Sequence, residues 1–171
     1  MPASIVSAII EYINLFESHS INWSELAINS GSSLSINCFA NKVVQAAQAF
    51  NKALFIKPDY HEALYNMGIC LEKQDNMEEA IQAYSKALSI KPAYIDAHRS
   101  LSRVTKYKVD NPQISAVKDL LNGPEIQDED RCKLHYTYAK MNEDLGDFNV
   151  AFDNYVAGGK IRKALLSYNG D

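Results

Sequence analysis

The sequence contains few of the residues that break helices: only seven glycines and five prolines occur among its 171 residues. Alanine, leucine, isoleucine and lysine are abundant instead, which favours helices over strands. The formal net charge of −4 lacks the excess of Lys and Arg that broad nucleic-acid binding requires, so no nucleic-acid partner is expected. A chain of this length can bury one substantial core, and we therefore expect residues 1–171 to form a single domain.

Cysteine is also scarce, since Cys38, Cys70 and Cys132 lie far apart and form no C-x-x-C pair. This pattern is typical of reduced thiols in a cytoplasmic protein and argues against a disulfide framework or a zinc site. Long apolar runs are missing too. The first segment, "MPASIVSAIIEYINLF", is interrupted by Glu11 and has no basic leader, and no later run is long enough to cross a membrane. We therefore expect a cytoplasmic protein without a membrane partner.

One nonapeptide is present in two nearly identical copies. "KALFIKPDY" ends at Tyr60, and "KALSIKPAY" ends 34 residues later at Tyr94. At the same separation, Ala53 and Pro58 within the first copy become Ala87 and Pro92. The match also extends upstream of the nonapeptide, where Ala46 and Phe50 become Ala80 and Tyr84. Spacings of four and three residues place the small and aromatic side chains on one helix face. The proline then ends each helix, because it has no N–H for the hydrogen-bond ladder.

A partner helix is expected before the second copy, in "HEALYNMGICLEK". One face of this segment carries, at helical spacing, Leu64, Met67, Gly68 and Leu71. Asp75 and Asn76 supply a turn between the two helices. The 34 residues from His61 to Tyr94 are therefore predicted to form a helix hairpin.

This unit resembles the tetratricopeptide repeat, whose pattern is W-x2-L-G-x2-Y followed by A-x3-F and P. The matching residues are Leu64, Met67, Gly68, Leu71, Ala80, Tyr84 and Pro92. The resemblance implies an all-α fold, a right-handed superhelix (α-solenoid) of about four antiparallel helix hairpins. It also implies a non-catalytic module that binds a peptide or a protein surface in a concave groove lined by the first helix of each hairpin.

The same register predicts two further units. Ala116 follows Ala80 by 36 residues, and Ala151 follows Ala116 by 35, so short insertions are sufficient. We expect a third unit with an insertion at residues 95–128, its first helix lying in "YIDAHRSLSRVTKYK", and a fourth unit at residues 129–160. The alanine of each unit should be a buried contact point between helices.

The two ends of the chain deviate from this pattern. Residues 1–60 are predicted to form a degenerate first unit, whose second helix begins at about Lys42. The segment "NSGSSLSIN" is too rich in Ser, Asn and Gly for a helix, so residues 19–40 are predicted to be an irregular insertion. Residues 3–18 are then the partner helix. Residues 161–171 either continue the last helix or cap the stack.

Side chains off the packing faces of the first helices should point into the groove. The predicted groove residues are Tyr65, Ile69, Arg99, Arg103, Lys106, Tyr107, Tyr136 and Lys140. Cations beside tyrosines suit an extended peptide that carries carboxylates, and a solvated charged helix face is the alternative interpretation. The two-carboxylate clamp with which some members of the family bind chaperones is not expected. Asp96 and Ser100 occupy the positions where that clamp needs Lys and Arg.

No arrangement of residues suggests catalysis, a metal site or a cofactor, and we predict that the chain is not an enzyme. The histidines form neither H-x3-H nor H-E-x-x-H, and His98 and His135 occupy a packing position of the repeat. "GGK" at residues 158–160 superficially suggests a phosphate loop, but an upstream glycine is missing and Ile161 replaces the required Ser or Thr. The two glycines instead predict a kink or a tight helix crossing, since each costs about 1 kcal/mol within a helix.

A second resemblance covers residues 129–168. "LHYTYAK", "EDLGDFNVAF" and "KIRKALLSY" look like the end of the repeat region in bacterial proteins that join tetratricopeptide repeats to a sulfotransferase domain. The resemblance implies an alternative function, an accessory domain that recruits substrate for a sulfotransferase-type enzyme. The expected nucleotide-binding loop would follow Asp171, so this chain would not itself carry the activity.

Overall fold

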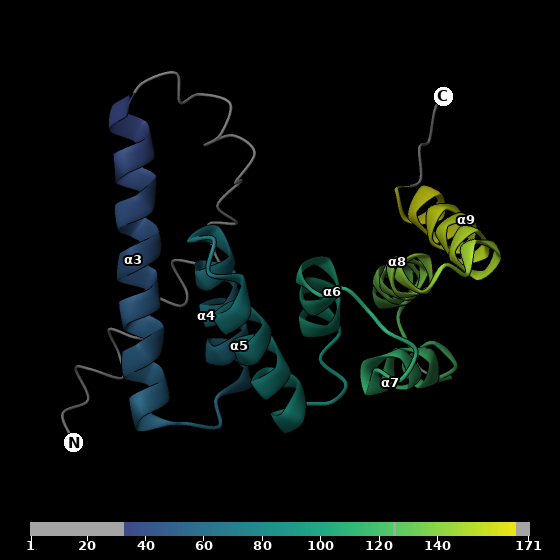
Figure 1. The fold of residues 1–171 in the computed structure, drawn as a ribbon, viewed down its shortest axis with the longest axis horizontal. Coiled ribbons are helices and arrows are strands. Elements are labelled where there is room, and N and C mark those ends of the chain that lie inside the picture. The colour runs from purple at the N-terminus through teal and green to yellow at the C-terminus, as the bar shows by residue number, and fades with distance from the viewer. Residues whose placement is uncertain (1–32, 125, 167–171) are drawn as a thin grey trace.

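The computed structural model describes residues 33–124 and 126–166, and all regular structure in these ranges is helical. The helices are, in chain order, α3 (Ser33–Ile56), α4 (His61–Lys73), α5 (Met77–Ile90), α6 (Ile95–Val104), α7 (Pro112–Leu121), α8 (Asp128–Leu145) and α9 (Phe148–Leu165). They follow one another across the molecule from α3 at one end to α9 at the other (Figure 1). The predicted all-α solenoid is confirmed.

The predicted hairpin is formed by α4 and α5, which pack closely against each other. Asp75 adopts a left-handed conformation (φ 62°) in the turn, and the N–H of Asn76 donates a hydrogen bond to the carbonyl of Leu71. The two helices meet at Gly68, where a Cβ atom would lie 2.5 Å from Cε1 of the Tyr84 ring. Gly68 is therefore required by the close packing of the aromatic side chain that the repeat pattern places opposite it.

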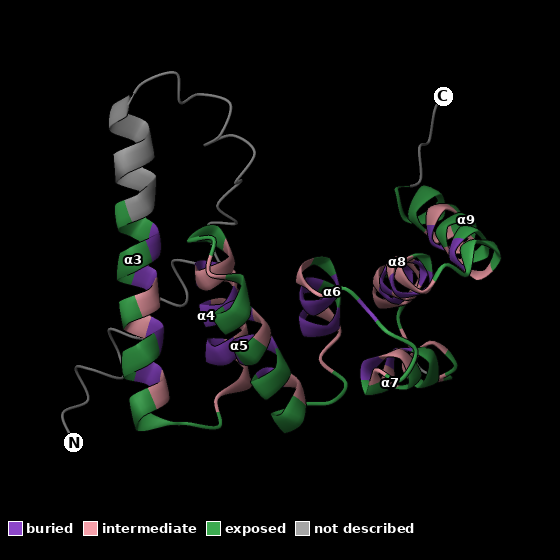
Figure 2. Ribbon diagram, in the orientation of Figure 1, coloured by how far each residue is buried: buried purple, intermediate pink, exposed green. Residues whose placement is uncertain are grey.

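Helix α3 packs on α4 and buries Phe50, together with small residues on both helices, in one apolar cluster (Figure 2). The helix begins at Ser33, nine positions before the expected start at Lys42. The prediction of an irregular insertion is therefore wrong for residues 33–40. Serine and asparagine cost only a few tenths of a kcal/mol in a helix, and propagation from an established helix outweighs this preference. The expected partner helix at residues 3–18 lies outside the described residues.

The third unit is more open than predicted. Helix α6 ends at Val104, not at Lys108, because Thr105 is extended (φ −111°, ψ 139°). Helix α7 begins after Asn111, whose side chain accepts a hydrogen bond from the backbone N–H of Gln113. It packs on α8 and does not form a close hairpin with α6, which itself packs between α5 and α8 (Figure 1).

The fully buried residue of α7 lies one position after the residue that the repeat register predicts. Val117 is 0% exposed, whereas Ala116 is only half-buried, so the expectation that Ala116 is the buried contact of its unit is wrong. The equivalent alanines of the other units, Ala46, Ala80 and Ala151, are all buried.

The fourth unit is a close hairpin of α8 and α9, joined through Gly146 in the left-handed conformation (φ 80°). A Cβ atom at Gly158 would lie 3.3 Å from Cβ of His135 on α8, which confirms a tight crossing at this glycine. Helix α9 runs without a break to Leu165. Residues 161–165 therefore continue the last helix, and residues 167–171 lie outside the described part of the chain.

Candidate functional site

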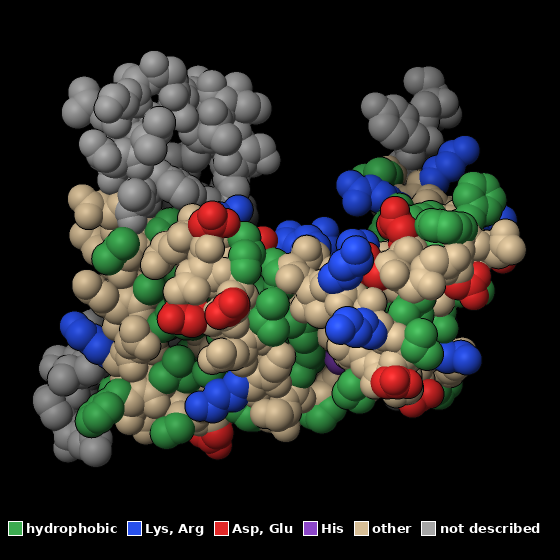
Figure 3. Space-filling model, in the orientation of Figure 1, with side chains coloured by type: hydrophobic (Ala, Val, Ile, Leu, Met, Phe, Trp, Pro, Cys, Tyr) green, Lys and Arg blue, Asp and Glu red, His purple; other side chains and the backbone are tan. Residues whose placement is uncertain are grey.

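The predicted groove residues come mainly from the first helix of each unit. Tyr65 and Ile69 lie on α4, Arg99 and Arg103 on α6, and Tyr136 and Lys140 on α8, whereas Lys106 and Tyr107 follow the end of α6. Lys and Arg side chains gather around α6 and between α6 and α8 on the visible face (Figure 3). The described structure therefore has a basic surface near the middle of the stack.

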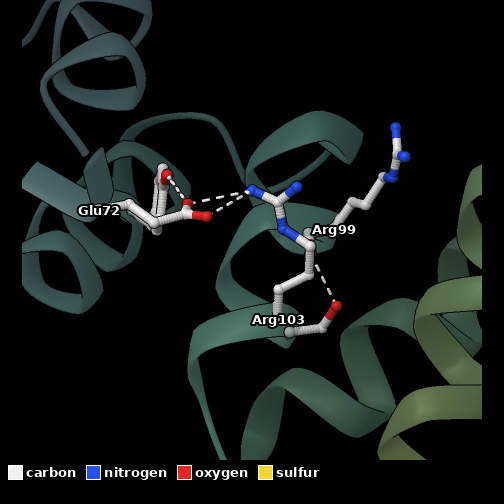
Figure 4. A network of polar contacts seen from close by, with 5 residues as sticks. Glu72, Arg99 and Arg103 are labelled. Atoms are coloured by element: carbon white, nitrogen blue, oxygen red, sulfur yellow. Dashed lines mark hydrogen bonds and ion pairs between the residues drawn. The ribbon is translucent and has the colours of Figure 1, made fainter. Parts of the chain in front are cut away.

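Arg103 is held in this surface by an ion pair with Glu72. Its Nη2 atom lies 2.9 Å and 3.0 Å from the two carboxylate oxygens of Glu72 on α4 (Figure 4). The same carboxylate accepts a hydrogen bond of 2.8 Å from the hydroxyl of buried Tyr84. Burial and this carboxylate raise the pKa of Tyr84 well above its ordinary value, so the hydroxyl keeps its proton. The network joins α4, α5 and α6 and fixes the orientation of the guanidinium group.

Arg99 and Lys106 are the predicted groove cations that remain available for an ion pair. Both side chains are exposed, and neither forms an ion pair with another residue of the described structure. The Arg99 side chain points away from Glu72 in Figure 4. The two side chains are therefore available to an anionic group outside the chain.

Lys140 is already neutralised within the chain, which sequence reasoning did not anticipate. Its Nζ atom lies 2.6 Å from Oδ1 of Asp144, a carboxylate that also accepts a hydrogen bond of 3.2 Å from the backbone N–H of Tyr107. Lys133 on the same helix pairs with Asp96 of α6 at 3.2 Å. These pairs connect α8 to the third unit and reduce the net positive charge at this end of the surface.

The aromatic residues of the predicted groove lie at contacts between helices. The Tyr65 ring lies 5.0 Å from the ring of Tyr94 and 5.9 Å from that of Tyr84, measured between centroids. The pKa of Tyr65 is raised because the side chain is largely buried. A hydrogen bond with Ser100 opposes this shift but does not reverse it. Tyr136 lies 6.2 Å from Tyr155 of α9, and both rings retain solvent contact. Their exposed edges can contact a ligand.

Tyr107 is not a groove residue, and its assignment to the groove was wrong. The residue is 2% exposed and belongs to the apolar cluster formed with Val117, Leu134 and Met141. The error follows from the early end of α6, because an extended segment turns the Tyr107 side chain into the core. The predicted register assumed a continuous helix at this point.

A buried polar chain lies behind Tyr107. The Tyr107 hydroxyl donates to Oε1 of Gln113 at 2.7 Å, and the Gln113 side-chain N–H group lies 3.1 Å from Nδ1 of His98. Nε2 of His98 in turn lies 2.8 Å from the carbonyl oxygen of Pro92. The predicted packing role of His98 is therefore confirmed, and burial lowers its pKa despite the opposing effect of the Pro92 carbonyl.

A cleft of about 470 Å³ opens between α5, α6 and the start of α7. Apolar side chains such as Ile81, Leu88 and Leu101 line most of it, and none of the predicted groove residues does. The buried hydroxyl of Thr105 at its edge has no hydrogen-bond partner within the described structure. The sequence contained no signal for this cleft, because it results from the position of α7.

Within residues 33–124 and 126–166, His, Cys, Asp and Glu nowhere form a group of three that could hold a metal ion. None of the helices in those ranges has the length and apolar character needed to cross a membrane.

The α4–α5 hairpin is the unit by which the chain is classified. A sequence profile of the tetratricopeptide repeat matches residues 61–94, the unit with Gly68 packed on Tyr84. The chain therefore contains a tetratricopeptide repeat, and its fold is that of a tetratricopeptide-repeat solenoid. Such repeats generally serve as scaffolds for protein–protein interaction.

Solved structures with a similar fold include BtubC (BKLC) from P. vanneervenii, with 15% sequence identity and a TM-score of 0.56 over 77% of this chain and 61% of that one. One structure of MamA has 17% identity and a TM-score of 0.58, over 96% and 92% of the two chains. A second MamA structure has 16% identity and a TM-score of 0.56, over 98% and 88%. The chain thus spans less than two thirds of BtubC and most of MamA. No curated protein matches the sequence.

At these identities the likeness extends to the fold alone. The resemblance of residues 129–168 to sulfotransferase-linked repeats is not supported by any of these matches.

Proposed function

We propose that this chain is a non-catalytic interaction module that binds an extended, acidic segment of a partner protein on the surface formed by α4, α6 and α8. The observation that carries the proposal is the pair of exposed, unpaired cations, Arg99 and Lys106, beside the fixed guanidinium of Arg103. A carboxylate-bearing peptide would supply the missing counter-charges through charge-assisted hydrogen bonds. On the cysteine pattern of the sequence, we place this module in the cytoplasm.

In this proposal Arg103 contributes hydrogen-bond donors in a defined orientation more than it contributes free positive charge. Its Nη2 atom is occupied by Glu72, but the side chain remains 54% exposed, so its other N–H groups face solvent. A guanidinium held in one orientation loses little side-chain entropy when a ligand binds. The exposed edges of Tyr65 and Tyr136 flank this position along the stack and suit the apolar parts of a peptide.

The competing interpretation is that Arg99 and Lys106 are ordinary solvated side chains. The two interpretations predict different results when the same change of net charge is made at different positions. If the site is specific, peptide binding requires Arg99 and Lys106 themselves. If the effect is only general attraction, reversing two other exposed lysines weakens binding equally. The test is therefore affinity capture with mass spectrometry, followed by fluorescence anisotropy with a labelled acidic peptide from a captured partner. The protein is compared with the Arg99→Glu/Lys106→Glu variant.

The matched control is Lys86→Glu/Lys118→Glu, which makes the same charge change at exposed positions of α5 and α7. We expect the Arg99/Lys106 variant to lose binding and the control to retain it. Equal affinities of all three proteins would refute the proposed site. Arg103→Glu should also abolish binding, but it places a second carboxylate beside Glu72, so its unfolding midpoint must be measured in parallel.

A second candidate function, recruitment of substrate for a sulfotransferase-type domain, is supported only by the resemblance of residues 129–168. An open reading frame that continues beyond Asp171 into a nucleotide-binding loop would favour it.

A further inference from the structure

The outer face of α9 carries a row of exposed apolar side chains. Phe148, Phe152, Tyr155 and Val156 follow one another at spacings that place them on one helix face, with exposures of 68%, 66%, 38% and 38%. Most of α9 is exposed in Figure 2, and hydrophobic side chains group over it in Figure 3. Isolated exposed apolar residues are ordinary, whereas a contiguous row of them indicates an interaction surface.

The repeat register shows what this face is suited to contact. In the α4–α5 unit, Ile81 and Tyr84 pack in a cluster with Leu101 of the next helix, α6. The signature alanines, Ala80 and Ala151, align these two residues with Phe152 and Tyr155 of α9. Tyr155 retains a contact with α8, because its hydroxyl donates a hydrogen bond of 2.9 Å to Glu143, but within the described structure no helix covers Phe152 as α6 covers Ile81. The face therefore has the apolar character of one that receives a helix.

Gly159 indicates that the missing contact is a helix in close approach. Its neighbour Gly158 is explained by the crossing with α8, but a Cβ atom at Gly159 would meet only the Tyr136 hydroxyl oxygen, at 3.9 Å. A glycine within a helix costs about 1 kcal/mol, and no internal contact requires this one. Gly159 lies one turn beyond Tyr155 on the exposed face, where the lack of a side chain admits a second backbone.

The charges of α9 point to a second copy of the same helix. The N-terminal half of α9, together with its N-cap residue, carries Asp147 and Asp153. The C-terminal half carries Lys160, Arg162 and Lys163. Two copies in antiparallel orientation bring each acidic half beside the basic half of the other, whereas parallel copies bring like charges together. In this orientation Phe148 lies opposite exposed Leu166, Tyr155 lies opposite Gly159, and Phe152 lies opposite Arg162, whose guanidinium group can stack on the aromatic ring.

We propose that two copies of this chain associate through their α9 helices, packed antiparallel about a two-fold axis near residue 157. Such an isologous interface adjoins the proposed peptide surface at Tyr136, whose ring lies 6.2 Å from that of Tyr155. It does not involve Arg99, Arg103 or Lys106, which carry the peptide proposal, so the two proposals can fail separately.

The association is tested by sedimentation velocity from micromolar to millimolar concentration. We expect a monomer–dimer equilibrium for the native chain and a monomer throughout for Phe152→Lys, which places a second cation opposite Arg162 of the other copy. The control is Phe55→Lys on α3, which changes an 89% exposed phenylalanine and should leave the dimer intact. Unchanged circular dichroism verifies that each variant is folded. A native chain that stays monomeric, or a dimer unaffected by Phe152→Lys or dissociated by Phe55→Lys, would overturn the proposal.

The orientation is tested by disulfide cross-linking in a Cys38→Ser background, where Cys70 and Cys132 are buried. In the antiparallel pair, two Val156→Cys residues are offset by about 3 Å along the axis, and two Phe148→Cys residues by about 27 Å, from a rise of 1.5 Å per residue. We expect a covalent dimer for the first variant and none for the second. Cross-linking at both positions indicates a parallel pair and refutes the model of the interface, as does a lack of cross-linking at Val156→Cys.

Discussion

Gly68→Ala is the substitution that tests most directly how the repeat is packed. The new methyl group would lie 2.5 Å from Cε1 and 2.7 Å from Cδ1 of Tyr84, far inside the ordinary contact distance. The ring cannot move into solvent, because Tyr84 is 0% exposed and its hydroxyl is bonded to Glu72. A displaced ring also strains the hydrogen bond that supports the Arg103 ion pair.

Three contributions determine the expected change in the free energy of unfolding. Overpacking of a core costs about 1–3 kcal/mol, and weakening of a hydrogen bond to a charged group costs about 1 kcal/mol or more. Replacing glycine by alanine within a helix returns about 1 kcal/mol. We therefore expect a net loss of about 2 kcal/mol in the free energy of unfolding, and a melting temperature lower by roughly 4–8 °C for a domain of this size.

Urea denaturation followed by far-ultraviolet circular dichroism measures the effect. The matched control is Gly159→Ala, which gains the same helix propensity without a clash and should be more stable by about 1 kcal/mol when measured at a concentration where the chain is monomeric. In a double-mutant cycle, Tyr84→Leu should make Gly68→Ala neutral or stabilising. A Gly68→Ala variant as stable as Gly159→Ala would refute the reasoning.

Three further predictions concern the third unit. Tyr107→Phe removes the hydroxyl that bonds Gln113 and leaves a buried amide oxygen without its donor, so the urea midpoint should fall by an amount equivalent to about 1–2 kcal/mol. His98→Gln should flatten the pH dependence of stability. Because the folded-state pKa of His98 is lowered, its contribution is present above the unfolded pKa of about 6.5 and is lost as pH falls through the folded value, which urea titrations from pH 8 to pH 5 will detect. Asn111→Ala removes the cap of α7 and should lower the melting temperature by an amount equivalent to about 1 kcal/mol, with no change if the cap is not formed in solution.

The regular part of the fold could be predicted because its determinants are local. The spacing of Gly68, Ala80 and Tyr84 specifies which helix faces meet, and Pro58 and Pro92 mark where helices end. The two glycines at residues 158 and 159 likewise predicted the tight crossing that is observed at Gly158. These features depend on residues a few positions apart, whose helical periodicity is visible in the sequence.

The candidate site was predicted less completely, since side-chain pairing depends on residues distant in sequence. The pattern identified Arg103 and Lys140 as groove cations. The partner of Arg103 is Glu72, 31 residues earlier. Lys140 pairs with Asp144, four residues later on the same helix, and this carboxylate is also held by the backbone N–H of Tyr107, 37 residues earlier. Tyr107 was misplaced because α6 was assumed to continue past Val104. No local feature reports the Glu72 partner of Arg103 or the Tyr107 contact of Asp144, so the exposure and pairing of the cations had to come from the structure.

The sequence by itself determined that this protein is a stack of helix hairpins with a repeated 34-residue unit, because side chains at helical spacing must bury one face against a neighbour. Only the tertiary structure decided where the repeat departs from its pattern: the early end of α6, the displaced α7 with its cleft, and the uncovered face of α9. Each of these depends on competition between distant segments for the same buried surface, and that competition is settled only when the helices pack together.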